Sequence, residues 1–312
     1  MYYFDMKHLT KSSSVKGGKV VRAPSAENRF YYITRTAHYQ HQKSDIETVE
    51  LVKSGNMPKW AERQPAKFWS AADQYERASG RTATTLVIAL PKELSKTQRI
   101  ELANAFIEQF ANRYSFPYSC AIHHHRGLLQ GIDQPHLHFM YSERQQDDIE
   151  RHAEQFFKRY NRNEPKKGGC QKLTADVLGM GQAQVRLYRE ETEQLINSSL
   201  AQHAPTKKII ICGLEVEVPS AVSCLSHQDY NAKHGTNLKD VPMIDSWILN
   251  AKPDSPHFAR RGVAIEEVAS LRAHNNLEMY RPYYDKALHE QTLKDQPRHT
   301  PPKPSGGSDF GM

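Results

Sequence analysis

The chain has 312 residues, a formal net charge of +7 and a hydrophobic content of 38%. This length suits one large domain with appendages or two small domains. The excess of Lys and Arg favours a polyanionic partner, nucleic acid above all, although a basic soluble protein without such a partner has the same composition. No stretch reaches the roughly 18 apolar residues of a transmembrane helix, so we expect no membrane insertion.

The cysteines and the N-terminus indicate a cellular compartment. Cys120, Cys170, Cys212 and Cys224 form no CxxC pair, and the first stretch, MYYFDMKHLTKSS, lacks the apolar segment of a signal peptide. We therefore expect a cytoplasmic protein with free thiols and no cysteine zinc site.

The N-terminal part of the chain predicts a strand, a loop and a helix. Residues 1–9 have strand character, and residues 10–24 are rich in Lys, Ser and Gly, as in a loop. Ser25 can cap the N-terminus of a helix that continues to about Tyr39.

A helix, a strand, a further helix and two strands follow. Pro65 suits the first turn of a helix that ends at Gly80. The run TTLVIAL is β-branched and apolar, which predicts a buried strand. Ser95 and Gln98 have the spacing of a capping box at the start of the next helix. YSCAIH and HLHFMY are then short strands.

The second half of the chain has weaker patterns. AEQFFKRYN is a short helix or turn, and EPKKGGCQK is a flexible basic loop. Residues 173–202 are helical, although Gly179 and Gly181 weaken the pattern. KKIIICGLEVEVP predicts a hairpin, residues 228–295 are mixed and weakly periodic, and the Pro/Gly/Ser-rich residues 296–312 form a disordered tail.

The alternation of these elements predicts an α+β fold, in which helices cover one face of a central antiparallel sheet. We expect three parts along the chain. Residues 1–205 form the functional domain, residues 206–295 form a C-terminal extension of unknown role, and residues 296–312 form the disordered tail.

Two histidines lie one residue apart in HLHFMY. Because alternate side chains of a strand share a face, His136 and His138 point to the same side. His123 lies in the preceding strand, in CAIHHH, and adjacent antiparallel strands can bring it beside the pair. The three would form a metal site with open positions for substrate. Three neutral imidazoles prefer Mn, Zn, Co or Ni to Mg.

Other interpretations of these histidines stay open. A single strand histidine is more often a hydrogen-bonded core residue than a metal ligand, and only the spacing with a third histidine favours a metal. We expect His124 and His125 to be solvent-facing loop residues. The histidine motifs of metallo-β-lactamases, deubiquitinases and two-histidine phosphoesterases need further residues that this sequence lacks.

The stretch ENRFYYITR offers a nucleophile for such a metal. Tyr31 and Tyr32 lie close to Arg29 and Arg35, and on a helix Tyr32 and Arg35 share a face. A guanidinium there can bind phosphate and favour the phenolate. On a basic protein, a metal and a nucleophile suggest phosphodiester chemistry by in-line attack. Paired tyrosines on an amphipathic helix are usually packing residues, and that alternative stays open.

Several stretches together resemble the relaxase domain of the MobA/MobL family. They are GNMPKWAERQPAKFWSAADQYERASGRT, ALPKELSKTQRIELANAFIEQF, PYSCAIHHHR with QPHLHFMYSER, and IERHAEQFFKRYNRNEPKKGGCQK. The resemblance covers about residues 1–200 in the family's order, and is greatest to mobilisation relaxases of broad-host-range plasmids. It implies the HUH endonuclease fold, a catalytic tyrosine at Tyr32, and metal ligands at His123, His136 and His138.

The resemblance implies a conjugative mobilisation relaxase. Such an enzyme nicks one strand of plasmid DNA at the origin of transfer through a covalent 5′-phosphotyrosyl intermediate and can rejoin it. The implied metal is Mg or Mn, with Zn, Co or Ni as alternatives. Expected partners are single-stranded origin DNA, relaxosome accessory proteins and a type IV secretion coupling protein, and the protein is expected to travel with the DNA. Two other functions stay open, a rolling-circle replication initiator and a non-cleaving DNA-binding accessory protein.

The sequence departs from the family on the strand before ALP, where relatives often carry acidic residues. Thr85 and Val87 stand there instead. The remaining candidates for acid–base work or for supporting the site are Glu76, Glu93 and Arg35. Beyond about residue 205 the resemblance is weak.

Single-stranded DNA is typically held by cationic grooves and aromatic platforms. Trp60 is the best stacking candidate, because it lies in a predicted loop. Seven basic side chains are candidate phosphate contacts, although any one of them is more often a solvated charge. They are Arg77, Arg81, Arg144, Lys158, Arg159, Lys166 and Lys167.

Overall fold

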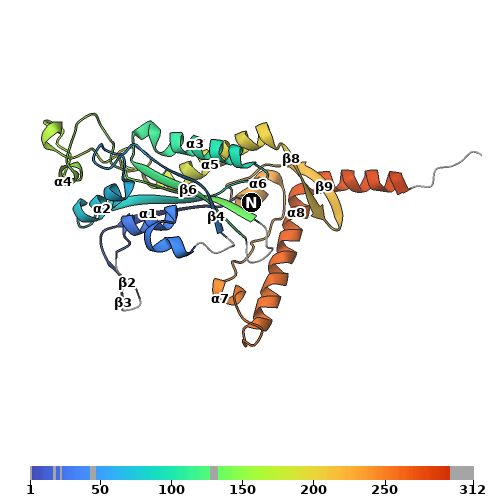
Figure 1. Ribbon diagram of the computed structural model, residues 1–312. Coiled ribbons are helices and arrows are strands. Elements are labelled where there is room, and N and C mark those ends of the chain that lie inside the picture. The colour runs from blue at the N-terminus through green and yellow to red at the C-terminus, as the bar shows by residue number, and fades with distance from the viewer. Residues whose placement is uncertain (1, 17–18, 22, 43–46, 127–132, 296–312) are drawn as a thin grey trace, which may run out of the picture. The chain divides into compact units, whose positions relative to one another are not determined.

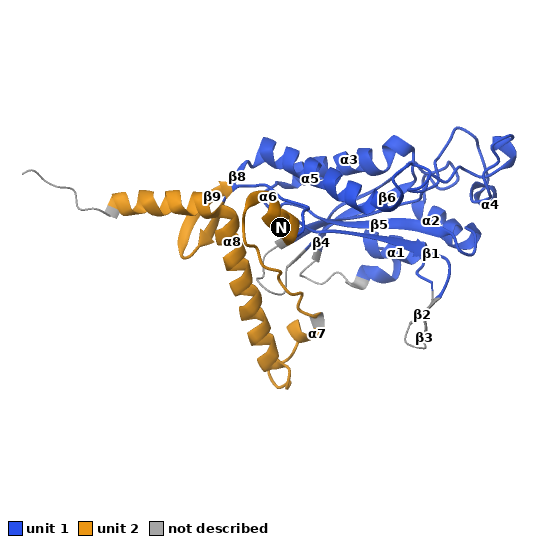
Figure 2. Ribbon diagram, turned by 180° about the vertical axis from the view of Figure 1, so that it is seen from behind, with its two compact units in different colours: residues 1–207, 219–226 blue, residues 208–218, 227–312 orange. Residues whose placement is uncertain are grey.

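The computed structural model describes residues 2–16, 19–21, 23–42, 47–126 and 133–295. The chain divides into two compact units, shown in Figure 2. Unit 1 comprises residues 1–207 and 219–226, and unit 2 comprises residues 208–218 and 227–312. The predicted tail, residues 296–312, lies outside the described residues. No helix within the described ranges combines the length and apolarity that crossing a membrane requires.

Five strands of unit 1 form one sheet in the order β1–β5–β7–β6–β4 (Figure 1). Their bounds are Phe4–Thr10 for β1, Glu47–Gly55 for β4, Arg81–Ala89 for β5, Tyr118–Arg126 for β6 and Asp133–Tyr141 for β7. All four pairings are antiparallel. The predicted α+β fold with a central antiparallel sheet is confirmed, and the HLHFMY strand lies at its centre.

Helices cover both faces of this sheet, so the prediction of a single covered face is wrong (Figure 1). Helices α3 (Lys96–Phe110) and α5 (Gln184–His203) cover one face. Helices α1 (Ala26–Thr34) and α2 (Pro65–Tyr75) cover the other. The central strands are buried on both sides, so helices must shield each face from water.

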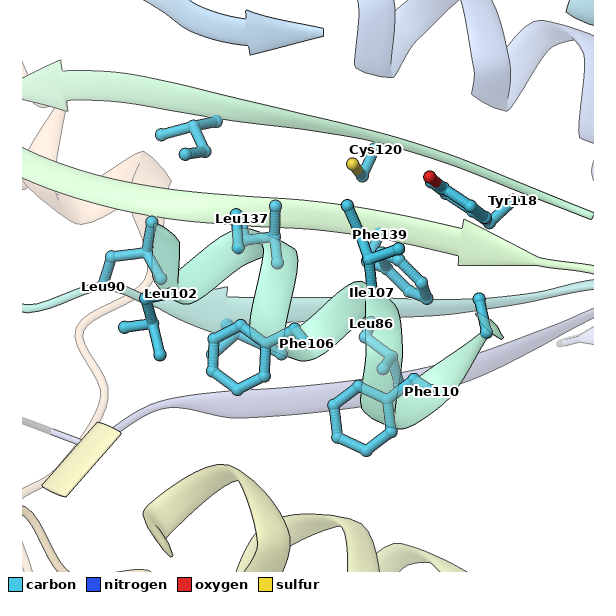
Figure 3. Close-up of a cluster of buried hydrophobic side chains, with 14 of the residues drawn as sticks. Leu86, Leu90, Leu102, Phe106, Ile107, Phe110, Tyr118, Cys120, Leu137 and Phe139 are labelled. Carbon is cyan, nitrogen blue, oxygen red and sulfur yellow. The ribbon is translucent and has the colours of Figure 1, made fainter. Parts of the chain in front are cut away.

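The core under α3 is built from large aliphatic and aromatic side chains (Figure 3). Phe106 and Phe110 of α3 lie in one cluster with Leu137 and Phe139 of β7. Met140 of β7 faces the other way, into the α1–α2 cluster. β7 thus contributes to both cores, which fixes the direction in which each of its side chains points.

The helix starts predicted at Ser25, Pro65 and Ser95 are confirmed. The helix predicted over residues 173–202 begins only at Gln184, as α5, and two predicted helix ends are wrong. Ser25 accepts a hydrogen bond from the Asn28 backbone N–H at 3.0 Å, as expected of a cap. The helix then stops at Thr34 rather than Tyr39, because Arg35 adopts a left-handed conformation with φ of 52°. Helix α2 stops at Tyr75 rather than Gly80.

The capping box before α3 is also present. Ser95 accepts from the Gln98 backbone, and the Gln98 side chain accepts from the Ser95 backbone. These two hydrogen bonds satisfy backbone N–H groups that have no partner within the helix at its N-terminus.

Several irregular stretches differ from the predictions. Residues 14–16 and 19–21, predicted as loop, pair as the short hairpin β2–β3. The predicted flexible loop around EPKKGGCQK includes a 3-10 turn, Pro165–Lys167, and continues into a fully buried Cys170. Helix α4 is a single turn, Ala153–Phe156, and the remaining 3-10 turns are Ala37–Gln42, Asn112–Tyr114 and Gly181–Ala183.

The edge strand β4 was not predicted, and it changes the interpretation of the histidine run. A bulge in β4 lies at Glu50, where the register against β6 shifts. Its carboxylate accepts from His124 at 2.9 Å and pairs with Arg99 of α3. His124 is therefore a half-buried strand residue rather than a loop residue. His125 also lies on β6, and its side chain is outside the described part.

Unit 2 is built on one long helix. The predicted hairpin is present as β8 (Thr206–Ile211) and β9 (Leu214–Pro219). Val216 and Val218 are buried in a cluster that Leu277 and Tyr280 of α8 line. The weakly periodic segment contains α6 (His227–His234), α7 (Ser246–Leu249) and α8 (Phe258–Asp295). Helix α8 departs from helical geometry at Tyr280, before the internal Pro282.

Arg144 is a structural residue, so its prediction as a DNA contact is wrong. Its side chain is 3% exposed and donates to both carboxylate oxygens of Glu76, each at 2.9 Å. It also donates to the carbonyl oxygens of Phe157, Lys158 and Cys170, at 2.7, 3.0 and 2.9 Å. Because these bonds use the guanidinium inside the protein, none of it is offered to a phosphate.

The same geometry argues against acid–base work by Glu76. Burial by itself raises the pKa of the Glu76 carboxyl, but the hydrogen bonds and charge of Arg144, helped by Lys172, bring that pKa below its ordinary value. The carboxylate is thus held ionised at the end of the sheet where β7 finishes.

We expect Arg144→Gln to lower the free energy of unfolding by about 3–5 kcal/mol, because it leaves the Glu76 charge buried without its partner. Urea denaturation measures the loss, and the exposed Arg77→Gln is the matched control, with an expected change within about 0.5 kcal/mol. A similar loss in both variants would show that the buried pair is energetically unimportant.

The pair also predicts how stability depends on pH. The folded-state pKa of Glu76 is lowered, so its contribution is present above the unfolded pKa, 4.5, and is lost as pH falls through the folded pKa. The wild type should lose more stability in acid below about pH 4.5 than Arg144→Gln does. Equal acid losses in the two proteins would contradict this assignment.

Candidate functional site

The register of two strands brings the three predicted histidines together. His123 of β6 lies directly opposite His136 of β7, and Ala121 lies opposite His138. The small Ala121 side chain leaves space beside His138. One ring nitrogen from each histidine lies within 4.8 Å of the others. The three imidazoles therefore converge on the sheet face that α1 and α2 cover, as the spacing predicted.

The donor chemistry of this cluster fits a divalent metal. His123 is fully buried and His138 is 7% exposed. Burial, followed by the charges of His136, His123, Arg29 and Arg35, lowers the pKa of His138 to about 2. The imidazole is then neutral, which is the form that ligates a metal. Its Nδ1 is buried and has no hydrogen-bond partner within the part of the chain that the structure describes.

Backbone carbonyls orient the other two rings. Nδ1 of His136 lies 3.0 Å from the Gln134 carbonyl oxygen, which can only accept, so this nitrogen is the donor and Nε2 is the atom that would ligate a metal. That Nε2 lies 3.1 Å from Nε2 of His138. His123 Nε2 lies 2.6 Å from the Ile33 carbonyl oxygen. Such carbonyl contacts commonly fix the ring orientation of metal-binding histidines.

Tyr32, and not Tyr31, faces the histidines. The Tyr32 ring packs edge-on against His138, with 5.7 Å between ring centroids. Tyr31 points elsewhere, since its hydroxyl donates to Glu27 at 3.1 Å and its ring contacts His38. The predicted nucleophile and the predicted metal ligands thus meet, although they are far apart in the sequence.

Two arginines flank the Tyr32 ring. The guanidinium carbon of Arg35 lies 4.2 Å from the ring centroid, and that of Arg29 lies 5.4 Å away. Arg35 also donates to the Tyr32 carbonyl oxygen at 2.7 Å. Its predicted place beside the nucleophile is what the structure shows. Arg29 also lies three residues from Tyr32 on the helix. The expectation that residues three apart share a helix face, which pointed to Arg35, therefore points to Arg29 as well.

The start of α1 is fixed by Asp73, for which the sequence predicted no role. The Asp73 carboxylate of α2 accepts from the Ser25 hydroxyl at 2.7 Å and from the backbone N–H groups of Ala26 and Glu27 at 2.8 and 3.0 Å. A carboxylate at a helix N-terminus is also favoured by the helix dipole. No local pattern marks Asp73, because its role arises only when α1 packs on α2.

The acidic candidates do not reach this site. Glu76 is paired with Arg144, and a Glu93 carboxylate oxygen lies 3.9 Å from Lys207 Nζ. Val87, at one of the positions that are often acidic in relatives, lies opposite His138 in the sheet. Within the described residues, neither predicted carboxylate contacts Tyr32 or His138, so the charge beside the nucleophile comes from arginines.

The predicted DNA contacts lie at the other end of the sheet. His136 is near the start of β7, whereas the segment that contains Lys158 and Lys167 hydrogen-bonds to Arg144, beyond the end of β7. An open pocket of about 630 Å³ lies in that segment. Its lining includes Lys158, Arg159, Arg162 and Lys167, and Lys166 is exposed next to it.

The other predicted contacts differ in how accessible they are. Arg77 is exposed, and Arg81 is partly exposed and paired with Glu143 at 2.9 Å. Trp60 is half-buried, and its ring stacks on Phe68 with 6.0 Å between centroids. Its ring edge also contacts Phe156. Packing on the core of unit 1 therefore accounts for Trp60 without a DNA base.

The sequence of the chain is similar to those of two known proteins. It is 46% identical to the 43 kDa relaxation protein of Salmonella typhimurium over 155 residues, which are 49% of this chain and 39% of that protein. It is 43% identical to Mobilization protein A of Escherichia coli over 169 residues, which are 54% of this chain and 22% of that protein. The match thus spans well under half of either relative.

One solved structure is also similar, under the description "Molecular Basis of Vancomycin Resistance Transfer in Staphylococcus aureus". The likeness covers 65% of this chain and 94% of that chain at 19% identity, with a TM-score of 0.41. A score at this level does not establish a common fold.

A family model gives the broadest match. The model described as the MobA/MobL family matches residues 25–211, a range that includes Tyr32 and all three histidines of the cluster. This range is more than half of the chain. The chain therefore belongs to the MobA/MobL family.

Proposed function

We propose that the chain is a mobilisation relaxase, which nicks one strand of plasmid DNA at an origin of transfer and can rejoin it. The observation that carries the proposal is the packing of the Tyr32 ring against His138, inside a cluster of three converging imidazoles. The names of the two relatives, a relaxation protein and a mobilization protein, support the same function.

In the proposed reaction, Tyr32 is the nucleophile. Its phenolic oxygen attacks the scissile phosphorus in line, a bond from phosphorus to the tyrosine oxygen forms, and the bond to the 3′ oxygen breaks. The phenolic proton passes to solvent, and the departing 3′ oxygen takes up a proton. The products are a 5′-phosphotyrosyl enzyme and a free 3′-hydroxyl. Because the ester replaces one phosphodiester bond by another, attack by the 3′-hydroxyl reseals the strand.

His123, His136 and His138 would hold a divalent metal, Mg or Mn in the first instance, which would neutralise charge on the phosphate. The chain's own residues keep these ligands in place: the Gln134 carbonyl orients His136, and the Ile33 carbonyl links His123 to the helix that carries Tyr32. Nucleophile and metal ligands are thus positioned by one set of contacts.

The proposed partners follow from this reaction. They are single-stranded DNA at the origin, relaxosome accessory proteins and a type IV secretion coupling protein. Residues 1–205 would form the nicking and strand-transfer domain, with residues 206–295 as an extension without an assigned role. Incubation of the purified chain with labelled oligonucleotides from the origin region tests the proposal, because only a strand-specific nick with an attached protein fits it. Binding without a nick would indicate a non-cleaving accessory protein.

Tyr32→Phe should abolish the covalent adduct and retain DNA binding, because it removes only the phenolic oxygen. Tyr31→Phe is the matched control and should form the adduct at the wild-type level, since Tyr31 points to Glu27. Denaturing gels with a labelled oligonucleotide measure the adduct. Loss in the Tyr31 variant with retention in the Tyr32 variant would reverse the assignment.

His138→Ala should lower metal affinity and nicking steeply and affect folding less, because it leaves two of the three ligands. Excess EDTA should have the same effect on wild type, and added Mn should restore nicking of supercoiled plasmid. His289→Ala, an exposed histidine of α8, is the control and should leave nicking unchanged. Undiminished nicking by wild type in EDTA would rule out the metal.

The logarithm of the affinity for single-stranded DNA should fall linearly with the logarithm of the salt concentration. The slope should be about −0.7 for each phosphate contact. If the basic pocket binds the strand, changing Lys166 and Lys167 to Ala should weaken binding and flatten the slope by about 1.4. Changing the exposed Lys92 and Lys96 to Ala removes the same charge at the start of α3, the helix that covers the opposite sheet face, and should leave the slope unchanged. Fluorescence anisotropy gives the slopes, and a salt-independent wild-type affinity would refute binding through charge.

A further inference from the structure

Arg29 is a charged residue of the site that has no partner of opposite charge among the described residues. It lies one helical turn before Tyr32 on α1, with its guanidinium carbon 5.4 Å from the centre of the Tyr32 ring. Arg29 and Arg35 both contact the Tyr32 ring, and that ring packs on His138, so both guanidiniums are near the histidine cluster. The side chain is half-buried and not at the bottom of the core, so a ligand can approach it.

Three other shielded arginines of unit 1 have protein anions as partners. Within the described residues, Arg29 forms no ion pair, and its Nε is buried without a hydrogen-bond acceptor. The paired ones are Arg99 with Glu50, Arg144 with Glu76, and Arg151 with Asp147. A shielded donor without an acceptor costs free energy, and an anionic ligand would remove that cost.

Arg35 has a different role from Arg29. It is 5% exposed, its backbone is left-handed, and it donates to the Tyr32 carbonyl oxygen while its guanidinium lies over the Tyr32 ring. These contacts use Arg35 to hold the nucleophile in place. Of the two guanidiniums at the ring, that of Arg29 is the less buried, so it is the one that a substrate can reach.

We propose that Arg29 donates hydrogen bonds to the non-bridging oxygens of the scissile phosphodiester beside Tyr32, and that it does so without the metal. This inference rests on the proposed relaxase function. A planar guanidinium suits the oxygens of a phosphate, and its contact would place the phosphorus next to the phenolic oxygen. The phosphate would thus be bound from two sides, by Arg29 on α1 and by the histidine cluster on the sheet.

The test measures binding in EDTA, so that neither metal nor cleavage contributes. Wild type first identifies the cleaved phosphate on an origin oligonucleotide in the presence of Mn. That phosphate is then replaced by an uncharged methylphosphonate, and a second oligonucleotide carries the replacement at a distant phosphate. Fluorescence anisotropy gives the affinities of wild type, Arg29→Gln, Arg29→Lys and the control Arg63→Gln, an exposed arginine without a described side-chain contact.

For wild type and Arg63→Gln, we expect the methylphosphonate at the cleaved position to weaken binding about tenfold, the size of a lost charged hydrogen bond. Arg29→Gln should bind the unmodified strand about tenfold more weakly than wild type does. The methylphosphonate should then lower the affinity of this variant only slightly further, because the contact is already absent. Arg29→Lys should recover part of the affinity, because the charge stays and the planar fork is lost. The distant replacement should affect all four proteins equally.

If the methylphosphonate weakens binding by Arg29→Gln as much as it weakens binding by wild type, the inference is overturned. The relaxase proposal stays intact in that case. If Arg29→Gln does not fold, Arg29→Lys decides the matter, because a wild-type response of that variant to the methylphosphonate would also overturn the inference. Failure of wild type to cleave or attach to any origin strand would overturn the proposed function, and this inference with it.

Discussion

The site depends on the register of β6 against β7. Antiparallel pairing places His123 directly opposite His136, and the two-residue period of the strand puts His138 on the same face. A slip of one residue would turn His123 towards α3 and separate the cluster. The large side chains next to the histidines on β7, Leu137 and Phe139, prevent this slip, because they fill the core on the α3 face. The apolar core thus specifies where the polar site lies.

Helix α1 is tied to this sheet at several points. Asp73 of α2 caps its start, Arg35 closes its end, and the Ile33 carbonyl accepts from His123. Tyr32 therefore has little freedom to move away from His138. A nucleophile held in advance near its target saves the entropy of finding it during the reaction. The same contacts explain why a short helix, which is marginal by itself, carries the proposed chemistry.

Signals within a few residues predicted much of the fold, whereas contacts between distant residues were not predictable. The Ser25 cap, the Ser95 capping box and the His136–His138 spacing depend on neighbours in the sequence, and all three were predicted. The end of α1 was missed, because Arg35 becomes left-handed through contacts with Tyr32 and no glycine marks the position. Strand β4 was missed because it is an edge strand with charged residues and a bulge. The pairing of Arg144 with Glu76, 68 residues away, has no local pattern at all.

The central claim is that Tyr32 becomes bonded to DNA next to a three-histidine cluster. Mass spectrometry of the trapped adduct tests it most directly, after nuclease and trypsin digestion. Trypsin releases residues 30–35, FYYITR, which contain both candidate tyrosines, and fragmentation of this peptide distinguishes them. The structure predicts the remaining nucleotide on Tyr32. A nucleotide on Tyr31, or on a tyrosine outside this peptide, would contradict the assignment of the site.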